Sequence, residues 1–368
     1  MAKINLQGLR QIDWLLLLAT SLLVFFGLVA LASVTIAKSP PEWEPFFRQS
    51  IFLILGLLLS GLAILVDYRI LRGYSMHAYV FSIILLVGVL IFGTTIRNTT
   101  GWFVIAGISF QPVELVKLLW IVAFSAYLAR YARAFDQWRH LWISGGFMLA
   151  LLILIMLQPD LGSAFVILVI YLGLLLLANV KLKQVLLLLL ILVTAGVLSY
   201  FFLLQNYQKD RIKVLFQPGS DPLGSGYNVT QSIIAIGSGQ FFGRGFGQGT
   251  QSQLNFLPEQ QTDFIFSVFA EEFGFLGTAL LLSAFALLLI RSSIIARRSR
   301  EDFGAFLSAG IGIWFVVQLF INVGMNMGIL PVTGIPLPLV SAGGSSLVSS
   351  LVAIGLIQSV VLRTRLTV

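Results

Sequence analysis

Long apolar runs separated by short polar segments dominate the sequence. Crossing a bilayer as a helix takes about 17 to 25 predominantly apolar residues. Runs of this length lie at residues 14 to 36, 46 to 66, 76 to 93, 113 to 129, 141 to 157, 161 to 179, 184 to 204, 264 to 290, 304 to 328 and 341 to 362. The pattern predicts an all-α polytopic membrane protein with ten transmembrane helices. One long polar connection, residues 205–262, joins the seventh and eighth helices, and we expect a single transmembrane domain over residues 1–368.

The composition supports a membrane protein and removes several other classes. Hydrophobic residues make up 58% of the chain and charged residues 10%, whereas about a quarter of the residues in soluble domains are charged. The chain has no cysteine, and its two histidines, His77 and His140, are far apart, so no thiolate or histidine motif predicts a metal site. The net charge of +8 follows membrane topology along the chain, so we expect no nucleic-acid partner.

The positions of lysine and arginine predict the orientation of the chain. The termini and the connections on their side hold fifteen of these residues, whereas the short loops on the other side hold three, Lys38, Arg48 and Arg97. Since positive charge is enriched in cytoplasmic loops, both termini are expected in the cytoplasm. The connection 205–262 is then extracytoplasmic, and we expect a multi-pass protein of the cytoplasmic membrane.

Ionisable and aromatic residues gather toward the predicted outer face. Charged groups inside spans are costly, so each is by default a functional hypothesis. The candidate site residues near this face are Arg97, Trp102, Gln111, Glu114, Lys117, Asp160, Arg244 and Asp263, with Ser341 in the loop VTGIPLPLVSAGGSS, residues 332–346. Proline and glycine interrupt that loop, and irregular backbone is tolerated at membrane depth only beside protein or a watery cavity. We expect these residues to surround one outward-facing cavity.

The main candidates also have purely structural interpretations. Asp263 precedes an apolar helix, where it can cap the N-terminus or interact with the helix dipole. Glu114 and Lys117 are three residues apart and can pair with each other, although Lys117 could equally meet a phosphate. Trp102 can anchor the chain at the membrane interface or stack on a sugar.

Two glutamates lie inside the apolar run that follows Asp263. At 100° per residue, Glu271 lies about 80° and Glu272 about 180° around the helix from Asp263, and both are roughly 12 Å deeper. The three side chains therefore cannot face one ligand. We assign recognition or chemistry to Asp263, and polar contacts between helices to at least one glutamate.

Several motifs follow one another over nearly the whole chain. They are FQPVELVK at 110–117, LQPDLG at 157–162, SDPLGSGYNVTQSIIAIGSGQ at 220–240, FLPEQQTDFIF at 256–266 and LPVTGIPLPLVSAGGSS at 330–346. With the ten-helix plan, they resemble the SEDS family of polymerases in bacterial cell-wall synthesis. GTQSQLNFLPE at 249–259 and FAEEFGF at 269–275 are more similar to its RodA branch than to its FtsW branch. Gln261 stands where the family usually has histidine, which puts in doubt any mechanism that needs this histidine.

The resemblance implies an enzyme. It would be a peptidoglycan glycosyltransferase that polymerises lipid II on the outer face of the bacterial cytoplasmic membrane, for cell elongation and shape. Asp263 would be the general base, and undecaprenyl pyrophosphate the leaving group. Glu114 and Lys117 resemble an essential pair of the family, and Trp102 matches a functional tryptophan.

The leaving group needs positive charge nearby. Lys117, Arg97 or Arg244 would supply it, or a divalent cation, Mg²⁺ or Mn²⁺. No residue pattern in the sequence chooses between the basic side chains and the ion.

The resemblance also implies partners, and two rival functions stay open beside the polymerase. The expected partners are a class B penicillin-binding protein, which is a transpeptidase, other membrane proteins of the elongation complex, and membrane lipid. One rival function is a transporter that flips lipid II, and the other is a non-catalytic scaffold for the transpeptidase. Charges near the outer face favour the polymerase, since alternating access favours polar groups near the midplane.

Overall fold

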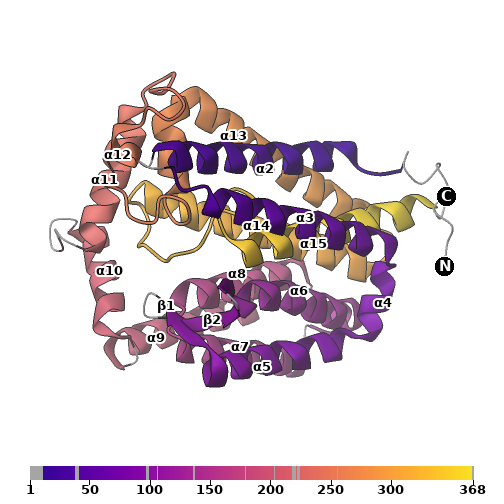
Figure 1. Cartoon of the computed structure of the whole chain (residues 1–368). Coiled ribbons are helices and arrows are strands. Elements are labelled where there is room, and N and C mark those ends of the chain that lie inside the picture. Colours follow the sequence, from indigo (N-terminus) through magenta and orange to yellow (C-terminus); the bar gives the residue numbers. More distant parts are fainter. Residues whose placement is uncertain are drawn as a thin grey trace.

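The computed structural model describes residues 11–37, 41–96, 99–105, 107–135, 137–178, 180–202, 204–217, 221, 224–254 and 256–366. Its apolar helices run side by side as a bundle (Figure 1). The start of α2 and the end of α15 lie at one end of the bundle with α4 (Tyr68–Gly73), which we call the terminal end. Strands β1 and β2 and helices α11 and α12 lie at the other end, which we call the loop end.

Every predicted apolar range contains a helix. These helices are α2 (Trp14–Ala37), α3 (Glu44–Leu65), α5 (Ser75–Phe92), α6 (Pro112–Tyr131), α7 (Trp138–Leu157), α8 (Leu161–Leu177), α9 (Leu182–Phe202), α13 (Ile265–Arg298), α14 (Asp302–Asn326) and α15 (Gly344–Leu366). In the described part of the chain, nine of them are long and apolar enough to cross a membrane. The predicted helical membrane fold is thereby confirmed. The tenth crossing stays a prediction, because the 17 residues of α8 span about 25 Å against a hydrocarbon core of about 30 Å.

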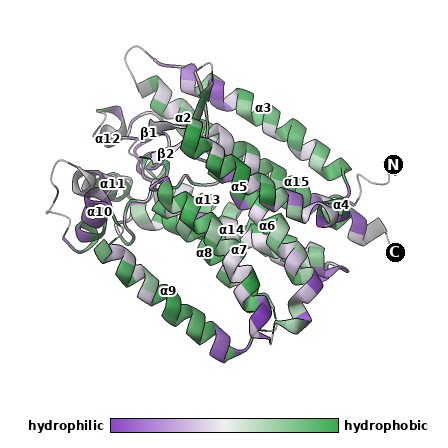
Figure 2. Ribbon diagram, turned by 90° about the horizontal axis from the view of Figure 1, so that it is seen from below, coloured by the Kyte–Doolittle hydropathy of each residue, from purple (hydrophilic) through white to green (hydrophobic). Residues whose placement is uncertain are grey.

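Helices α15 and α6 form the centre of the bundle. In the 18-residue apolar stretch of each helix, 89% of the residues of α15 and 72% of those of α6 are buried, against 6% of those of α9. α15 packs along α3 and α6, and α14 packs against α6, α8 and α13. Trp120 of α6 and Trp314 of α14 are among the largest enclosed side chains. Figure 2 shows α9 lying apart from the other helices with a hydrophobic surface. Protein contacts therefore fix α6 and α15, whereas α9 presents its apolar surface to lipid.

A small antiparallel sheet at the loop end joins α5 to α6. β1 (Thr94–Ile96) pairs with β2 (Thr99–Ile105), which pairs with β3 (Ile108–Phe110). Arg48 of α3 donates from Nη2 to Ser109 Oγ of β3 at 2.6 Å. The sequence did not predict this sheet, because strands of three and seven residues are too short for a clear alternation of polar and apolar positions.

The long connection between α9 and α13 contains three short helices. They are α10 (Asn206–Phe216), α11 (Ser225–Ser238) and α12 (Thr250–Gln253). Gln205 and Gln208 form a reciprocal capping box at the start of α10, and Gln208 Nε2 also donates to Pro159 O at 3.3 Å. The bond to Pro159 attaches the connection to the turn that precedes α8.

α13 is interrupted at Gly274, so the helix predicted over 264 to 290 is not continuous. Gly274 has φ 63° and ψ −160°, a conformation that glycine adopts far more readily than other residues. The N–H groups of residues 244–245 donate to the carbonyls of 271–272, both at 3.0 Å, and those of 275–276 donate to the carbonyls of 240–241 at 2.9 and 3.1 Å. The connection thus supplies partners for four backbone groups beside the break, where an apolar environment makes unpaired groups costly.

We expect Gly274→Ala to lower thermal stability. A Cβ at this position would lie 2.3 Å from Gly243 N, and the backbone conformation alone costs a non-glycine residue about 1–3 kcal/mol. Gly146→Ala in α7 is the matched control, because a Cβ there meets nothing within 4 Å and alanine is favoured over glycine in a helix by roughly 0.5–1 kcal/mol. The measurement is the thermal unfolding midpoint of each variant in detergent. Equal midpoints would contradict the conformational requirement at Gly274.

Candidate functional site

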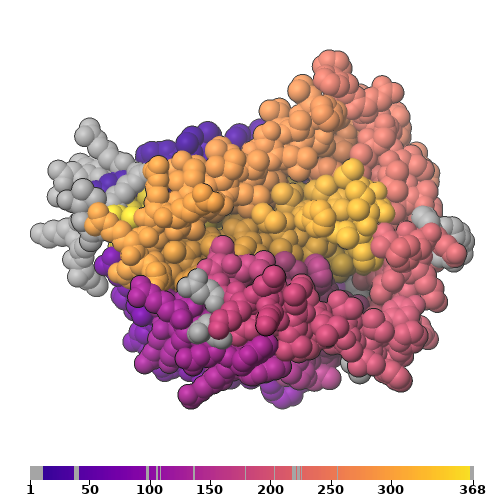
Figure 3. Space-filling model, turned by 180° about the vertical axis from the view of Figure 1, so that it is seen from behind, coloured from indigo at the N-terminus to yellow at the C-terminus, as the bar shows by residue number. Residues whose placement is uncertain are grey.

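Asp263 lies in the turn that leads into α13, at the loop end. Its backbone N–H donates to Glu259 O at 3.1 Å, and its side chain is partly exposed. The N-cap residue of α13 is Phe264, so Asp263 does not occupy the capping position. A Cβ on the exposed Gly334 would lie 3.6 Å from Asp263 Oδ2. The carboxylate therefore borders the connection between α14 and α15, which reaches the surface as the golden segment in Figure 3.

Two asparagines of α14 hold the backbone of this turn. Asp263 O accepts from Asn322 Nδ2 at 3.1 Å and from Asn326 Nδ2 at 3.0 Å. Asn322 also donates to Ile335 O at 2.9 Å, and Asn326 Oδ1 accepts from Ser267 Oγ at 2.5 Å. All three polar side chains are fully enclosed. Because buried amides cost free energy when they are left unpaired, the network fixes the turn against α14 and against the connection that follows it.

Ser341 fastens the α14–α15 connection to the same turn. Its Oγ donates to Thr262 O at 2.6 Å, and the next N–H along the chain donates to Gln261 O at 2.9 Å. Gln49 of α3 holds the connection from another side, donating to Ser341 O at 3.2 Å and accepting from Gly343 N at 3.1 Å. The Ser341 hydroxyl is buried and bonds only to backbone groups, at Thr262 O and Leu337 N, among the described residues.

Gln111 and Asp160 are the N-cap residues of two helices that begin beside this connection. The Gln111 N–H donates to Ser345 Oγ at 2.8 Å. The Asp160 carboxylate accepts from the backbone N–H three residues further on, at 2.9 Å. A Cβ on Gly162 would lie 2.8 Å from Ile335 Cγ1, so α8 starts directly against the connection. The structure thus places the start of α8 against the segment that borders Asp263, and the start of α6 against the first turn of α15.

Glu114 and Lys117 form the ion pair that their spacing predicted. Lys117 Nζ lies 2.7 Å from Glu114 Oε1, and the two residues are 0% and 1% exposed. Glu114 Oε2 accepts no hydrogen bond from any described residue. In this conformation the ammonium is enclosed by protein, so its contact with a phosphate stays a prediction. The pair first serves to avoid a lone charge in the interior.

Trp102 lies on β2 and is partly exposed. A Cβ on the neighbouring Gly101 would lie 3.6 Å from Gln158 Oε1, so this part of the strand sits over the turn before α8. Arg97 lies outside the described residues. Trp102 is therefore near the helix starts at the loop end, whereas the structure says nothing of Arg97.

The two glutamates of α13 make contacts between elements. Glu271 accepts three hydrogen bonds from residues 250–252, at 2.9 to 3.3 Å, and so caps α12. Glu272 accepts from Ser33 Oγ of α2. The predicted contacts between helices are confirmed for both. Arg244 is exposed beside the two glutamates, and its backbone N–H donates to Glu271 O. Glu271 is eight residues beyond Asp263, which corresponds to roughly 12 Å along a helix.

Sequence reasoning missed Gln49, Asn322 and Asn326. The asparagines are four residues apart in the apolar run INVGMNM, so they share one face of a helix, and a polar pair inside a span is itself an indication of function. Gln49 follows Arg48 near the start of a span, where polar residues are ordinary. The asparagines could have been found from the sequence, and Gln49 could not.

Two cavities of the described chain are lined by residues other than Asp263. The larger, about 700 Å³, is lined by residues of α4 to α7 at the terminal end. The smaller, about 290 Å³, is formed by residues 238–244 beside the α13 break and includes Arg244. The single outward-facing cavity expected around all the candidates stays a prediction. Among the described residues there is also no group of three or more His, Cys, Asp or Glu side chains that could hold a metal.

Comparisons with known proteins cover nearly the whole chain. The FtsW/RodA/SpoVE family model, described as "cell cycle protein", matches residues 13–366. Peptidoglycan glycosyltransferase MrdB of Escherichia coli K12 is 35% identical over 346 residues, which cover 93% of this chain and 92% of that protein. Probable peptidoglycan glycosyltransferase FtsW of Aliivibrio salmonicida is 36% identical over 364 residues, with 95% and 87% covered.

Solved structures share the fold. A chain from a peptidoglycan synthase complex, described for its structural coordination of polymerization and crosslinking, matches with a TM-score of 0.80 at 31% identity, covering 96% of this chain and 98% of that one. The rod shape determining protein RodA of Thermus thermophilus matches with a TM-score of 0.68 at 29% identity, covering 96% and 97%. Sequence and fold together show that the chain belongs to the FtsW/RodA/SpoVE family of integral membrane proteins.

Proposed function

We propose that this chain is a peptidoglycan glycosyltransferase that polymerises lipid II. Relatives that carry this activity in their names match it over most of both chains. The observation that carries the mechanism is the environment of Asp263. Its carboxylate is on a partly exposed side chain, and its backbone carbonyl accepts hydrogen bonds from two buried asparagines. A carboxylate on a fixed turn is oriented before substrate arrives, which is what a general base needs.

The reaction is a displacement at a sugar carbon. Asp263 takes the proton of the acceptor sugar's 4-hydroxyl as that oxygen attacks the anomeric carbon of the lipid-linked donor. The new C–O bond forms while the bond from the anomeric carbon to the pyrophosphate oxygen breaks, and the configuration inverts. The electron pair of the broken bond leaves with undecaprenyl pyrophosphate.

One carboxylate suffices for this chemistry. Hydrolysing an ordinary glycoside takes an acid for the leaving oxygen and a second carboxylate as base or nucleophile. A pyrophosphate leaves as a stabilised anion and needs positive charge rather than a proton. Arg244 and Lys117 are the described basic candidates for that role, and Arg97 is a third.

The setting of the reaction follows from the charge pattern. Lysine and arginine mark the terminal end as cytoplasmic, so the loop end, with Asp263, faces outward, where cell-wall polymer is made. The matched chain of a complex that coordinates polymerization and crosslinking supports a penicillin-binding transpeptidase as partner. Other membrane proteins of an elongation complex and membrane lipid complete the proposed surroundings.

We expect Asp263→Asn to abolish glycan polymerisation. The amide keeps the shape of the side chain but cannot take a proton, and losing a general base lowers a rate by about 10²–10⁴-fold. Asp210→Asn in α10 is the control, because this exposed carboxylate pairs with Lys213 at 3.0 Å and has no part in the mechanism. The assay supplies labelled lipid II to purified protein with its transpeptidase partner and measures glycan chains on a gel.

Two outcomes would contradict the proposal. Chains made equally by wild type and Asp263→Asn would remove the base from the mechanism. Translocation of lipid II across vesicles by the wild type without any polymer would favour the transporter.

The Glu114–Lys117 pair gives a separate test. Lys117→Met leaves a buried carboxylate unpaired and should destabilise the protein by about 3–5 kcal/mol. Adding Glu114→Gln should restore most of the thermal stability, because no lone charge remains. We expect polymerisation to stay lost in the double variant, since the free Glu114 Oε2 and the ammonium are both gone. Recovery of activity together with stability would make the pair purely structural.

A further inference from the structure

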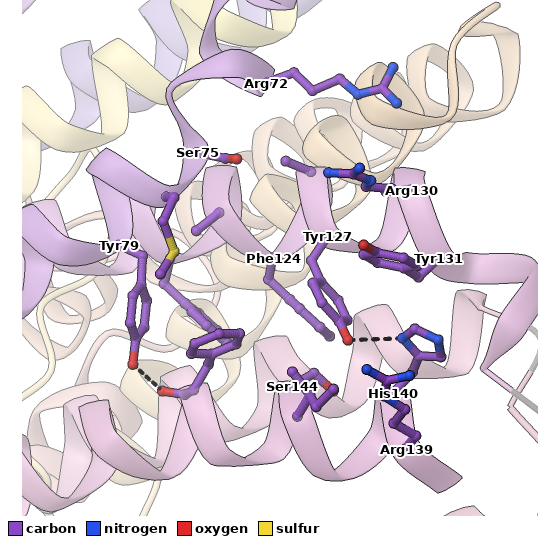
Figure 4. Close-up of a pocket in the computed structure, with 16 residues that line it drawn as sticks. Arg72, Ser75, Tyr79, Phe124, Tyr127, Arg130, Tyr131, Arg139, His140 and Ser144 are labelled. Carbon is purple, nitrogen blue, oxygen red and sulfur yellow. Dashed lines mark hydrogen bonds between the residues drawn. The ribbon is translucent and has the colours of Figure 1, made fainter. Parts of the chain in front are cut away.

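The larger cavity, about 700 Å³, has no part in the proposed reaction. It lies between α5, α6 and α7 at the terminal end, whereas Asp263 lies at the loop end (Figures 1 and 4). Its volume is within the range of about 300–1,000 Å³ that small-molecule sites occupy. The side chains that line it change in character from its mouth to its interior.

Positive charge surrounds the mouth. Arg72 is in the last turn of α4, Arg130 is in the last turn of α6 and Arg139 is in the first turn of α7. All three are exposed. Among the described residues, no Asp or Glu lines the cavity, and no ion pair joins any of the three arginines to a carboxylate. Figure 4 shows the three guanidinium groups with His140, whose Nδ1 lies 3.0 Å from Tyr127 Oη. Arginines grouped in this way suit a phosphate.

The interior is aromatic and apolar. Phe124 and Phe147 line it with Trp120 at its deep end, and Trp120 and Phe124 are each 2% exposed. From Arg130 to Trp120 is ten residues of one helix, about 15 Å, or half of a hydrocarbon core of about 30 Å. Trp120 Nε1 is buried and donates to no described residue. A ligand that matches this gradient has an anionic head at the membrane surface and an apolar chain below it.

We propose that this pocket binds one anionic phospholipid from the leaflet at the terminal end. Its phosphate lies among Arg72, Arg130 and Arg139, and one acyl chain runs along α6 toward Trp120. Basic pockets between transmembrane helices are known to select anionic headgroups. Enrichment of positive charge at this end accounts for the number of arginines, but not for their position around one aromatic cavity. The proposal does not depend on the polymerase assignment.

The test measures binding to the full chain in detergent. The probe is phosphatidylglycerol with a brominated acyl chain, which quenches tryptophan fluorescence on contact, and Trp120→Phe identifies the part of the quenching that comes from the pocket. Arg130→Gln with Arg139→Gln should weaken binding by about tenfold or more, since each basic residue near the headgroups contributes about 1 kcal/mol. Arg297→Gln with Arg298→Gln, exposed at the end of α13, removes the same charge away from the pocket and should change binding by less than about twofold.

A second variant tests the acyl-chain part. Ala123 lines the cavity, and Ala123→Phe should fill it and weaken phosphatidylglycerol binding while all the arginines remain. Phosphatidylcholine should bind far more weakly than phosphatidylglycerol. Equal effects of the two arginine pairs, or equal binding of the two lipids, would overturn the proposal. Competition by millimolar inorganic phosphate, with no effect of Ala123→Phe, would also overturn it and indicate a site for free phosphate.

Discussion

Irregular backbone inside an apolar bundle is possible here because its polar groups are paired within the protein. The turn at Asp263 and the α14–α15 connection lie outside the long helices, and the Asn322 and Asn326 amides donate to carbonyls of both. At the α13 break, backbone groups of the long connection do the same. Without such partners each freed group would cost several kcal/mol in a lipid environment. A non-helical site at this depth therefore requires the enclosed network around it.

The same pairing gives the site its chemical character. Bonds to the Asp263 carbonyl fix the backbone while the carboxylate stays partly exposed beside Gly334. The polar atoms of Asn326 and Ser341 all bond within the protein, so these side chains hold the turn and have no free group for a sugar. In the proposed reaction the leaving group departs as an anion, so the chemistry needs one base on a rigid scaffold, and positive charge at the leaving group.

Much of the fold and part of the site could be predicted from the sequence. The apolar runs are long and the charge pattern is simple, so all ten helical ranges were predicted, and the Glu114–Lys117 pair followed from helical spacing. The Gly274 break could not be predicted, because its partners lie thirty or so residues away in the connection. The role of Gln49 could not be predicted either, since it depends on a loop almost three hundred residues further along the chain. Local pattern reveals helices and neighbours on one helix, and long-range pairing needs coordinates.

The two ends of the bundle use charge in different ways. At the loop end, Glu114 and Lys117 neutralise each other in an ion pair. The Glu271 carboxylate accepts hydrogen bonds from backbone N–H groups. At the terminal end, three arginines from different elements line one cavity, and no described carboxylate lines it. Enrichment of positive charge at one end can orient a membrane protein wherever the basic residues lie around the bundle. It does not require three arginines to line the same cavity. Like charges that converge repel one another, so their common position over an aromatic pocket is best explained by an anion whose apolar part fills the space beneath.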